Sequence, residues 1–413
     1  MSKKHTRREY MFVVTVFMMG CLGVTQNISA QSENTGLSIS KEFFIVRGGL
    51  ENCRSRFITG KTGRVAFLGG SITTMPGWRD LTCEMLKKRF PDTKFEFINA
   101  GIGGTNSTLG ALRFEQDVFG KGRVDLLFLE FAVNDSGNES PDNRSARAME
   151  GIIRHALRLN PAIDILVQYF VDTDKAEEIR KGKMPDVILR HDRVAEHYGI
   201  PIINMATEMT RRIDAGEFTW QQFSGDTCHP SPFGHERYAE CIGKFLDAAW
   251  ANPLAQGASP KDHVIPEPLD RLNYEYGRFI DLDQAKVLNG WNRNKQWDTE
   301  KKCNYGGAVD VLAAEAPGAT LELAFEGTLI GVSEIAGMDA GIMECSVDGK
   351  APVSLDFYDH YCEMFHRPVC RILAEDLAPG KHVATLRMAQ DKNLKSQGHA
   401  ARILKFATNG PLK

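Results

Sequence analysis

The sequence has no surplus of charge of either sign. Its 413 residues carry 50 Lys and Arg against 53 Asp and Glu, a formal net charge of −3, with no block of like charge. Nucleic acids and anionic membrane surfaces attract strongly basic proteins, so this balance argues against both as partners. With 42% hydrophobic and 25% charged residues, the composition is that of a soluble globular protein long enough for two domains.

The cysteines follow no metal-binding or scaffold pattern. None of the nine forms a Cys-x-x-Cys pair, and no Cys/His spacing is typical of a zinc site. Beyond Cys21 there are eight: Cys53, Cys83, Cys228, Cys241, Cys303, Cys345, Cys362 and Cys370. They are too few for a disulfide scaffold in so long a chain, and most are expected to be small buried hydrophobic residues. Bridges among the last four stay open.

Long hydrophobic runs are missing except at the N-terminus. Residues 11–24, "MFVVTVFMMGCLGV", follow four basic residues and precede "TQNISAQ". The run is too short for a comfortable membrane span, so this order predicts a secretory signal peptide over residues 1–30, cleaved after Ala30. A lipoprotein signal ending at Cys21 is the less favoured alternative, because Met-Met-Gly precedes that cysteine. We expect an exported protein, periplasmic or secreted, without a membrane span.

Short apolar segments alternate with amphipathic helices between residues 65 and 250. The pattern predicts strands over 65–69, 94–101, 124–132, 162–170 and 199–205, and helices over 78–90, 145–159, 186–199 and 233–250. The third strand, "VDLLFLEFA", is almost continuously apolar, as expected when helices cover both faces of a sheet. The alternation predicts an α/β fold with a parallel sheet.

The composition and the hydrophobic pattern change after residue 250. "ANPLAQGASPKDHVIPEPLD" is rich in proline and reads as a linker or an extended strap. Beyond it, "TLELAF" alternates apolar and polar residues, and Asp348-Gly349 is a hairpin signal. We therefore predict a catalytic domain over residues 31–255, a linker over 256–275, and a β-sandwich, jelly-roll-like domain over 276–413.

Four polar or glycine-rich segments of the α/β half each lie just beyond the C-terminal end of a predicted strand. Parallel sheets bind ligands at the carboxyl ends of their strands. The segments contain Ser71 after "VAFLGG", Gly101, Gly103 and Gly104 in "NAGIGGTNS", Asn134 and Asp135 in "AVNDSG", and Asp226 and His229 in "SGDTCHPSPFGH".

A serine, a histidine and an aspartate in this arrangement suit nucleophilic acyl transfer. The histidine takes the proton of the serine hydroxyl, and the aspartate fixes the imidazole tautomer and stabilises its cation. Backbone N–H groups at Ser71 and in the glycine-rich loop, with the Asn134 amide, suit an oxyanion hole. Each segment alone is a common turn, and the combination in this order carries the prediction. The alternative elbow Gly-x-Ser-x-Gly is not met, because Thr73 occupies its last position.

At this point the sequence resembles a known family. "FLGGSIT", "NAGIGGTNS", "FAVND" and "DTCHPSPFGHERYAE" look like the four blocks of the SGNH, or GDSL-type, hydrolases, over about residues 60 to 250. The resemblance implies a flavodoxin-like three-layer fold and a catalytic triad of Ser71, Asp226 and His229. It also implies an oxyanion hole made by the N–H of Ser71 with Gly104 and Asn134. One departure is Gly70, where the commonest first block has aspartate.

An exported hydrolase of this type with a β-sandwich is similar to carbohydrate O-acetylesterases. The resemblance implies an acetylated polysaccharide or oligosaccharide as substrate, an acyl-enzyme on Ser71, and no metal or organic cofactor. Three alternatives stay open: an esterase or lipase on another ester, an acyltransferase, and a catalytically silent glycan-binding protein.

Other candidates have simpler interpretations. His191 and His197 stand six residues apart on one predicted helix, the wrong spacing for a metal pair. Glu130 either lines the site or is a buried, hydrogen-bonded carboxylate, and His235 is expected to pack or cap at the start of the last helix.

The β domain offers aromatic residues that suit sugar stacking: Trp291, Trp297 and Tyr305. Packing in the core is the favoured interpretation of these three.

Overall fold

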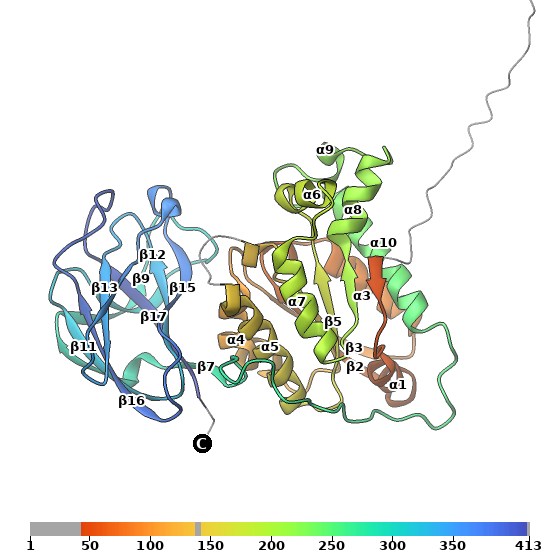
Figure 1. Ribbon diagram of the computed structural model, residues 1–413, viewed down its shortest axis with the longest axis horizontal. Helices are drawn as coiled ribbons and strands as arrows, with labels where there is room; N and C mark the ends of the chain where they lie inside the picture. Colours follow the sequence, from red (N-terminus) through yellow and green to blue (C-terminus); the bar gives the residue numbers. More distant parts are fainter. Residues whose placement is uncertain (1–42, 137–141, 411–413) are drawn as a thin grey trace, which may run out of the picture. The chain divides into compact units, whose positions relative to one another are not determined.

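The computed structural model describes residues 43–136 and 142–410 (Figure 1). The predicted signal peptide, Ala30 and Cys21 lie outside these ranges. In the described part of the chain, no helix has the length and apolar character needed to cross a membrane. The described residues form one compact unit.

A six-stranded sheet forms the first half of the chain. Its order is β1-β6-β5-β4-β2-β3. Five strands run parallel: β2 (Thr62–Gly69), β3 (Lys94–Gly101), β4 (Leu126–Leu129), β5 (Asp164–Tyr169) and β6 (Ile202–Asn204). The edge strand β1 (Phe44–Ile45) pairs antiparallel with β6. Counted along the chain, the parallel strands follow the flavodoxin-like order 2-1-3-4-5.

Helices cover this sheet. Every residue of β4 and β5 is buried, as expected for central strands covered on both faces. α3 (Trp78–Arg89) packs with α10 (Pro232–Ala249), and α4 (Ser107–Phe114) packs with α5 (Asp142–Leu159), which also contacts α7 (Asp186–His197) (Figure 1). The remaining helices of this half are α1 (Glu51–Gly60), α2 (Ser71–Thr74), α6 (Thr173–Arg180), α8 (Met205–Asp214) and α9 (Trp220–Phe223).

Helix starts use the capping chemistry that their sequences offer. The Asn106 side chain accepts a hydrogen bond from the Leu109 N–H at the start of α4. The Ser231 hydroxyl does the same for Gly234 at the start of α10, where Pro232 occupies the first helical position. Both caps satisfy backbone donors that a helix leaves unpaired, and proline costs nothing there. They fix where the loops that precede α4 and α10 end.

The second half of the chain is a β-sandwich of two antiparallel sheets, which confirms the predicted fold class. One sheet has the order β15-β12-β17-β10-β9, with β7 paired to β17, and the other has the order β14-β13-β16-β11-β8. The strands are β7 (Gly277–Ile280), β8 (Ala285–Asn289), β9 (Trp291–Trp297), β10 (Val309–Ala314), β11 (Thr320–Glu326), β12 (Ile330–Ala336), β13 (Ile342–Val347), β14 (Val353–Asp356), β15 (Arg367–Ala374), β16 (Lys381–Met388) and β17 (Ala401–Asn409).

Alternation along the strands builds the sandwich core. Leu321, Leu323 and Phe325, the apolar face predicted in "TLELAF", are all buried. Between β13 and β14, Asp348 and Gly349 have φ values of 53° and 71°, the left-handed conformations that a tight hairpin turn requires. The eight described cysteines are all free, so the structure contains none of the bridges left open among the last four.

The proline-rich segment between the two halves is a strap bound to the α/β layers. Its backbone bonds to α1 and to α5: the Ser55 hydroxyl donates to the Ala258 carbonyl, and Arg154 donates to the Pro266 carbonyl. The N–H groups of Leu269 and Asp270 donate to the Glu150 carboxylate. The strap is therefore an ordered part of the fold, whereas the predicted domain limits at 255 and 276 stay a prediction.

Polar contacts join the sandwich to the α/β layers. Arg144 on α5 pairs with Glu375, which also accepts a hydrogen bond from the Tyr274 hydroxyl. Arg147, one helical turn further along α5, pairs with Asp376 and with Asp270 of the strap. α5 is thus held by both the strap and the sandwich.

Candidate active site

Ser71 is the first residue of a single helical turn that follows β2. The Gly70 carbonyl accepts hydrogen bonds from the N–H and the hydroxyl of Thr74, at 3.1 and 3.0 Å, which close this turn. Ser71 is half-buried, whereas Ile72 behind it is in the core. The apolar strand therefore delivers the serine hydroxyl to the carboxyl edge of the sheet.

Close packing explains the two glycines before the serine. A Cβ on Gly70 would lie 2.2 Å from the Oδ1 atom of Asn134, and a Cβ on Gly69 would lie 2.3 Å from the Thr73 hydroxyl. Real side chains do not approach so closely. Gly70 thus leaves room for the Asn134 side chain.

The structure brings Ser71, His229 and Asp226 into one hydrogen-bonded chain. The Ser71 Oγ atom is 2.8 Å from Nε2 of His229, and Nδ1 of the same ring is 2.8 Å from Oδ2 of Asp226. A carboxylate only accepts, so Nδ1 carries the proton and Nε2 is free to accept the serine proton. This is the geometry of a nucleophile, a general base and an orienting carboxylate.

Asp226 is held as a carboxylate by its own loop. Its Oδ1 atom accepts hydrogen bonds from the N–H groups of Cys228 and His229, at 2.8 and 2.7 Å. Burial acts to raise the pKa of this carboxyl, but these two bonds and the His229 ring lower it to about 2. The negative charge that orients the imidazole therefore persists in weak acid.

Several contacts fix the loop that carries Asp226 and His229. The Ser224 hydroxyl donates to the His229 carbonyl at 2.7 Å, and the Trp220 indole donates to the Asp226 carbonyl at 2.8 Å. The Thr173 N–H at the start of α6 donates to the Thr227 carbonyl. Neighbouring backbone and side chains thus hold the loop between α9 and α10, and the triad does not depend on a flexible segment.

The segments that carry the predicted oxyanion donors contact the serine turn. Asn134 begins a short 3₁₀ helix after β4, and its side chain lies against Gly70. Gly104, in the loop between β3 and α4, has a φ of +71°, a conformation that favours glycine. The same loop is tied to the end of β2, because the Ile102 N–H donates to the Gly69 carbonyl at 3.1 Å.

A buried pair links the Asn134 turn to the glycine-rich loop. One oxygen of Asp135 accepts a hydrogen bond from the Ser107 N–H at 2.9 Å, and the other lies 3.0 Å from Nε2 of His191. The sequence pointed to Asp135 only as a residue at a strand end, and His191 only as half of an improbable metal pair. Nothing in their spacing shows that α7 would carry His191 to Asp135.

The remaining sequence candidates have structural roles. Glu130 is buried and its carboxyl accepts a hydrogen bond from the Val133 N–H; burial is the main cause that raises its pKa to about 8. His235 packs against Gly77, whose absent Cβ leaves room for the ring, and burial lowers the pKa of this histidine. His197 bonds to the Glu267 carbonyl of the strap.

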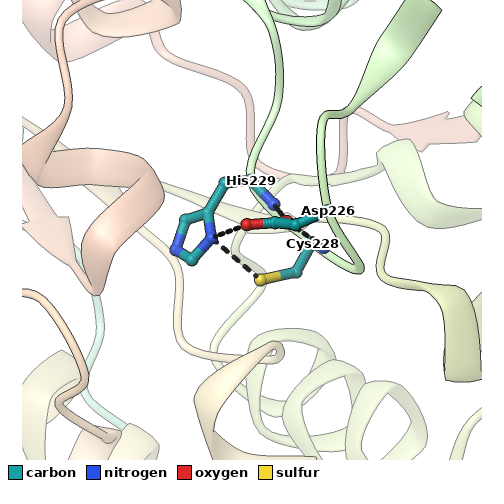
Figure 2. A group of neighbouring side chains, drawn as sticks. All are labelled: Asp226, Cys228 and His229. Atoms are coloured by element: carbon teal, nitrogen blue, oxygen red, sulfur yellow. Dashed lines mark hydrogen bonds and ion pairs between the residues drawn. The ribbon is translucent and has the colours of Figure 1, made fainter. Parts of the chain in front are cut away.

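Cys228 makes a further contact with the catalytic ring. Figure 2 shows its thiol beside the carboxylate of Asp226, with Sγ 3.4 Å from Nδ1 of His229. Burial and the neighbouring Asp226 charge raise the pKa of this thiol to about 11, so it is protonated at neutral pH. Cys228 therefore does not compete with Ser71 as a nucleophile.

The β-sandwich contributes one residue to this region. The side chain of Asn304, in the loop between β9 and β10, lies against the glycine-rich loop: a Cβ on Gly103 would be 2.8 Å from its Oδ1 atom, and one on Gly104 would be 3.1 Å from its Nδ2 atom. Asn304 has a φ of 64°, in the left-handed region. Sequence reasoning missed this residue, because no motif surrounds it and the contact joins positions 200 residues apart in the chain.

The three aromatic candidates of the β domain are buried or half-buried. Trp291 is buried in the sandwich core, as favoured from the sequence. Trp297 packs against His366, with ring centroids 5.5 Å apart, and Arg402 lies over its ring at 4.8 Å. Tyr305, next to Asn304, is half-buried.

Comparison with known proteins identifies the class of the α/β half. Residues 67–237 match the model of the GDSL-like Lipase/Acylhydrolase family. The α/β half therefore carries a GDSL-type hydrolase domain, and the chain is a serine ester hydrolase by class. No curated protein matches the chain.

Solved structures extend the likeness to the second half. Two crystal structures of a two-domain esterase (CEX) active on acetylated mannans share the fold. The one with mannopentaose is 23% identical with a TM-score of 0.72, and the other is 22% identical with a TM-score of 0.73. Each comparison covers 90% of this chain and 98% of the other. The likeness shows that both halves of the fold occur together elsewhere.

Proposed function

We propose that this protein is an exported serine esterase that removes O-acetyl groups from an acetylated polysaccharide. The observation that carries the proposal is the 2.8 Å contact between the Ser71 hydroxyl and His229, with Asp226 on the other side of the ring. Export rests on the predicted signal peptide over residues 1–30. The catalytic domain would then span residues 31–255, with the β domain over 276–413.

The chemistry follows from the positions of these groups. The Ser71 oxygen attacks the acetyl carbonyl while Nε2 of His229 takes the hydroxyl proton. The N–H groups of Ser71 and Gly104 and the Asn134 amide stabilise the oxyanion, each donor being worth roughly 3 kcal/mol. The carbon–oxygen bond to the sugar then breaks, and the sugar oxygen takes the proton from Nε2.

The second half of the cycle regenerates the enzyme. Nε2 of His229 takes a proton from water, and the hydroxide attacks the acetyl group on Ser71. The new oxyanion collapses, the bond to Ser71 breaks, and the serine regains its proton from His229 as acetate leaves. The Asp226 carboxylate stabilises the ring each time it becomes a cation.

Two observations favour a polysaccharide as the substrate. The structural neighbours with the same two halves act on acetylated mannans, according to their descriptions. In addition, Asn304 places the β domain beside the glycine-rich loop, where a bound sugar chain would contact both halves. We therefore propose acetylated mannan as the first substrate to examine.

Acetate release tests the proposal. Wild type and Ser71→Ala would be compared on an aryl acetate, acetylated mannan and acetylated xylan, with circular dichroism as the control for folding. We expect wild type to release acetate from a polysaccharide and the variant to release none. A wild type that is active on longer-chain esters alone would point to a lipase. Acetylated acceptor sugars formed in place of acetate would point to an acyltransferase, and a wild type inactive on every ester would point to a glycan-binding protein.

A further inference from the structure

Three side chains of different chemistry meet at the catalytic loop. One carboxylate oxygen of Asp226, Sγ of Cys228 and one ring nitrogen of His229 all lie within 4.8 Å of one another (Figure 2). Among residues 43–136 and 142–410, this is the one group of three His, Cys, Asp or Glu side chains so arranged. Thiolate, imidazole and carboxylate are the three ligand types that zinc takes from proteins.

Two distances from Nδ1 of His229 can be compared with the edges of a zinc tetrahedron. With zinc bonds of about 2.0 to 2.3 Å, tetrahedral ligand atoms lie roughly 3.4 to 3.6 Å apart. The Cys228 Sγ atom is already 3.4 Å from Nδ1 of His229. The 2.8 Å contact between Nδ1 and Asp226 Oδ2 must open by about half an ångström, which breaks the hydrogen bond between them.

The loop holds these ligands ready and leaves them accessible. The Oδ1 atom of Asp226 is bound by two backbone N–H groups, so Oδ2 is the oxygen that faces the other ligands. The side chains of Asp226 and His229 are 53% and 38% exposed, so an ion can reach them from solvent. The nearby cation Lys175 is paired with Asp172 and offers little repulsion.

We propose that Zn²⁺ binds Asp226, Cys228 and His229 and switches the esterase off. Zinc takes the place of the proton on Nδ1, and that proton moves to Nε2, the only other nitrogen of the ring. With Nε2 protonated, His229 no longer accepts the Ser71 proton. The Cys228 thiol loses its proton to solvent as the zinc–sulfur bond forms, so each bound ion releases one proton. A water completes the four ligands.

The switch uses Cys228, a residue with no part in the proposed acyl transfer. The inhibition rests on the proposed serine mechanism, whereas the binding of the ion does not. The two therefore need separate measurements.

Inhibition by Zn²⁺ of aryl acetate hydrolysis is the first measurement. Each variant is normalised to its own activity in chelator. Loss of even an outer partner of a metal changes its affinity by roughly 10- to 100-fold, so we expect Cys228→Ser to need at least about tenfold more Zn²⁺ for half inhibition. Cys303→Ser, another half-buried thiol, is the matched control and should match wild type. Cys228→Ala replaces Cys228→Ser if the latter fails to fold.

Binding is measured on the full chain without catalysis. Cd²⁺, a thiolate-binding substitute for zinc, is titrated into Ser71→Ala, and the ultraviolet charge-transfer band of a cadmium–thiolate bond is followed together with proton release. We expect a saturable band and about one proton per ion, both lost when Cys228→Ser is added to Ser71→Ala. The band in Ser71→Ala would support the site even if the wild type had no esterase activity.

Three results would overturn the proposal. One is equal Zn²⁺ inhibition of wild type and Cys228→Ser, another is a Cd²⁺ band that persists without Cys228 or never forms, and the third is an activity that falls when a chelator is added to the purified enzyme.

Discussion

The two halves of the molecule differ in how well their sequences predict the functional residues. In the α/β half, Ser71, Gly104 and Asn134 follow three strands that are consecutive in the chain and adjacent in one parallel sheet, so the three segments meet at a single edge. In the β-sandwich, Asn304 reaches the same region from a loop between antiparallel strands, with no strand-end rule to single it out. In this protein, the sequence of the parallel-sheet half therefore predicts the candidate site, whereas the sequence of the sandwich predicts only the fold.

Both halves enclose charged pairs. In the α/β half, β4 and β5 are buried throughout and apolar except for Asp164 and Gln168, but Lys175 pairs with Asp172 and His191 with Asp135 nearby; the sandwich has similar pairs. Arg367 and Arg371 both pair with Asp359, and Arg402 pairs with Asp339. Paired buried charges fix a particular packing but contribute little net stability. The sandwich has to keep one arrangement of its loops if Asn304 is to stay at the active site.

Among the substitutions that test this comparison, Ser71→Ala should have the largest effect on activity. If all the chemistry belongs to the α/β half, kcat falls on the order of 10⁶-fold, to the detection limit of acetate release. Circular dichroism and the melting temperature serve as folding controls. Activity within tenfold of wild type would place the nucleophile elsewhere.

Asn134→Ala comes next. Removal of one oxyanion donor should lower kcat by roughly 10²- to 10³-fold with little change in KM, because the donor acts mainly in the transition state. Steady-state kinetics on an aryl acetate measure this. A loss confined to KM would mean that Asn134 binds substrate and does not stabilise the oxyanion.

Gly70→Ala tests the same donor from the other side. The added Cβ would overlap Asn134 Oδ1 and push the amide away, so the loss of kcat should approach that of Asn134→Ala. Combined with Asn134→Ala, which removes the overlapped atom, the Gly70 substitution should cost much less than it does alone. Additive losses of kcat would mean that Gly70 and Asn134 act independently.

Asn304→Gly tests the contribution of the sandwich. It removes the side chain, and glycine adopts the φ of 64° without strain. Loss of one hydrogen-bonding group costs about 1 to 1.5 kcal/mol, so we expect kcat/KM on acetylated mannan to fall roughly tenfold. Activity on a small aryl acetate should change less, because that substrate is too short to contact both halves.

A matched change elsewhere in the sandwich is the control. Asp348→Gly also replaces a residue with positive φ, in the turn between β13 and β14. Equal losses in both variants, or equal losses on both substrates, would refute a role for Asn304 in substrate binding.

The last prediction concerns stability and leaves the chemistry aside. Glu130 has its pKa raised from 4.5 to about 8 in the folded protein, mainly by burial. Between these values the unfolded chain loses the proton and the folded chain keeps it, so wild-type stability falls as pH rises through this window. Glu130→Gln keeps the acceptor for the Val133 N–H and does not titrate. Its stability relative to wild type should rise from pH 5 to 8, by at most about 1.4 kcal/mol per pH unit.

Urea unfolding at several pH values measures this difference. A constant offset between the two proteins across the window would contradict a carboxyl that stays protonated in the fold.

Periodicity and the strand-end rule predict most of the fold. They give the five parallel strands, the main helices and the sandwich, because each leaves a local signal of period two or period 3.6. The sequence does not predict the edge strand β1 or six helices: α1, α2, α4, α6, α8 and α9. β1 and α2 have two and four residues, too few to carry a period.

The site divides in the same way. Ser71, Asp226 and His229 stand in segments whose order suggests the chemistry, and the structure brings them together. The contact of Gly70 with Asn134 and the pairing of Asp135 with His191 depend on packing between distant segments. Such contacts have no local pattern and needed the three-dimensional structure.

Acetylation of Ser71 during turnover tests the central claim most directly. Wild type is mixed with an aryl acetate, quenched in acid during the steady state, digested, and the peptide that contains Ser71 is examined by mass spectrometry. We expect one acetyl group on Ser71 in wild type and none on this peptide in Ser71→Ala. An acetyl group on another residue, with Ser71 unmodified while acetate is released, would contradict it.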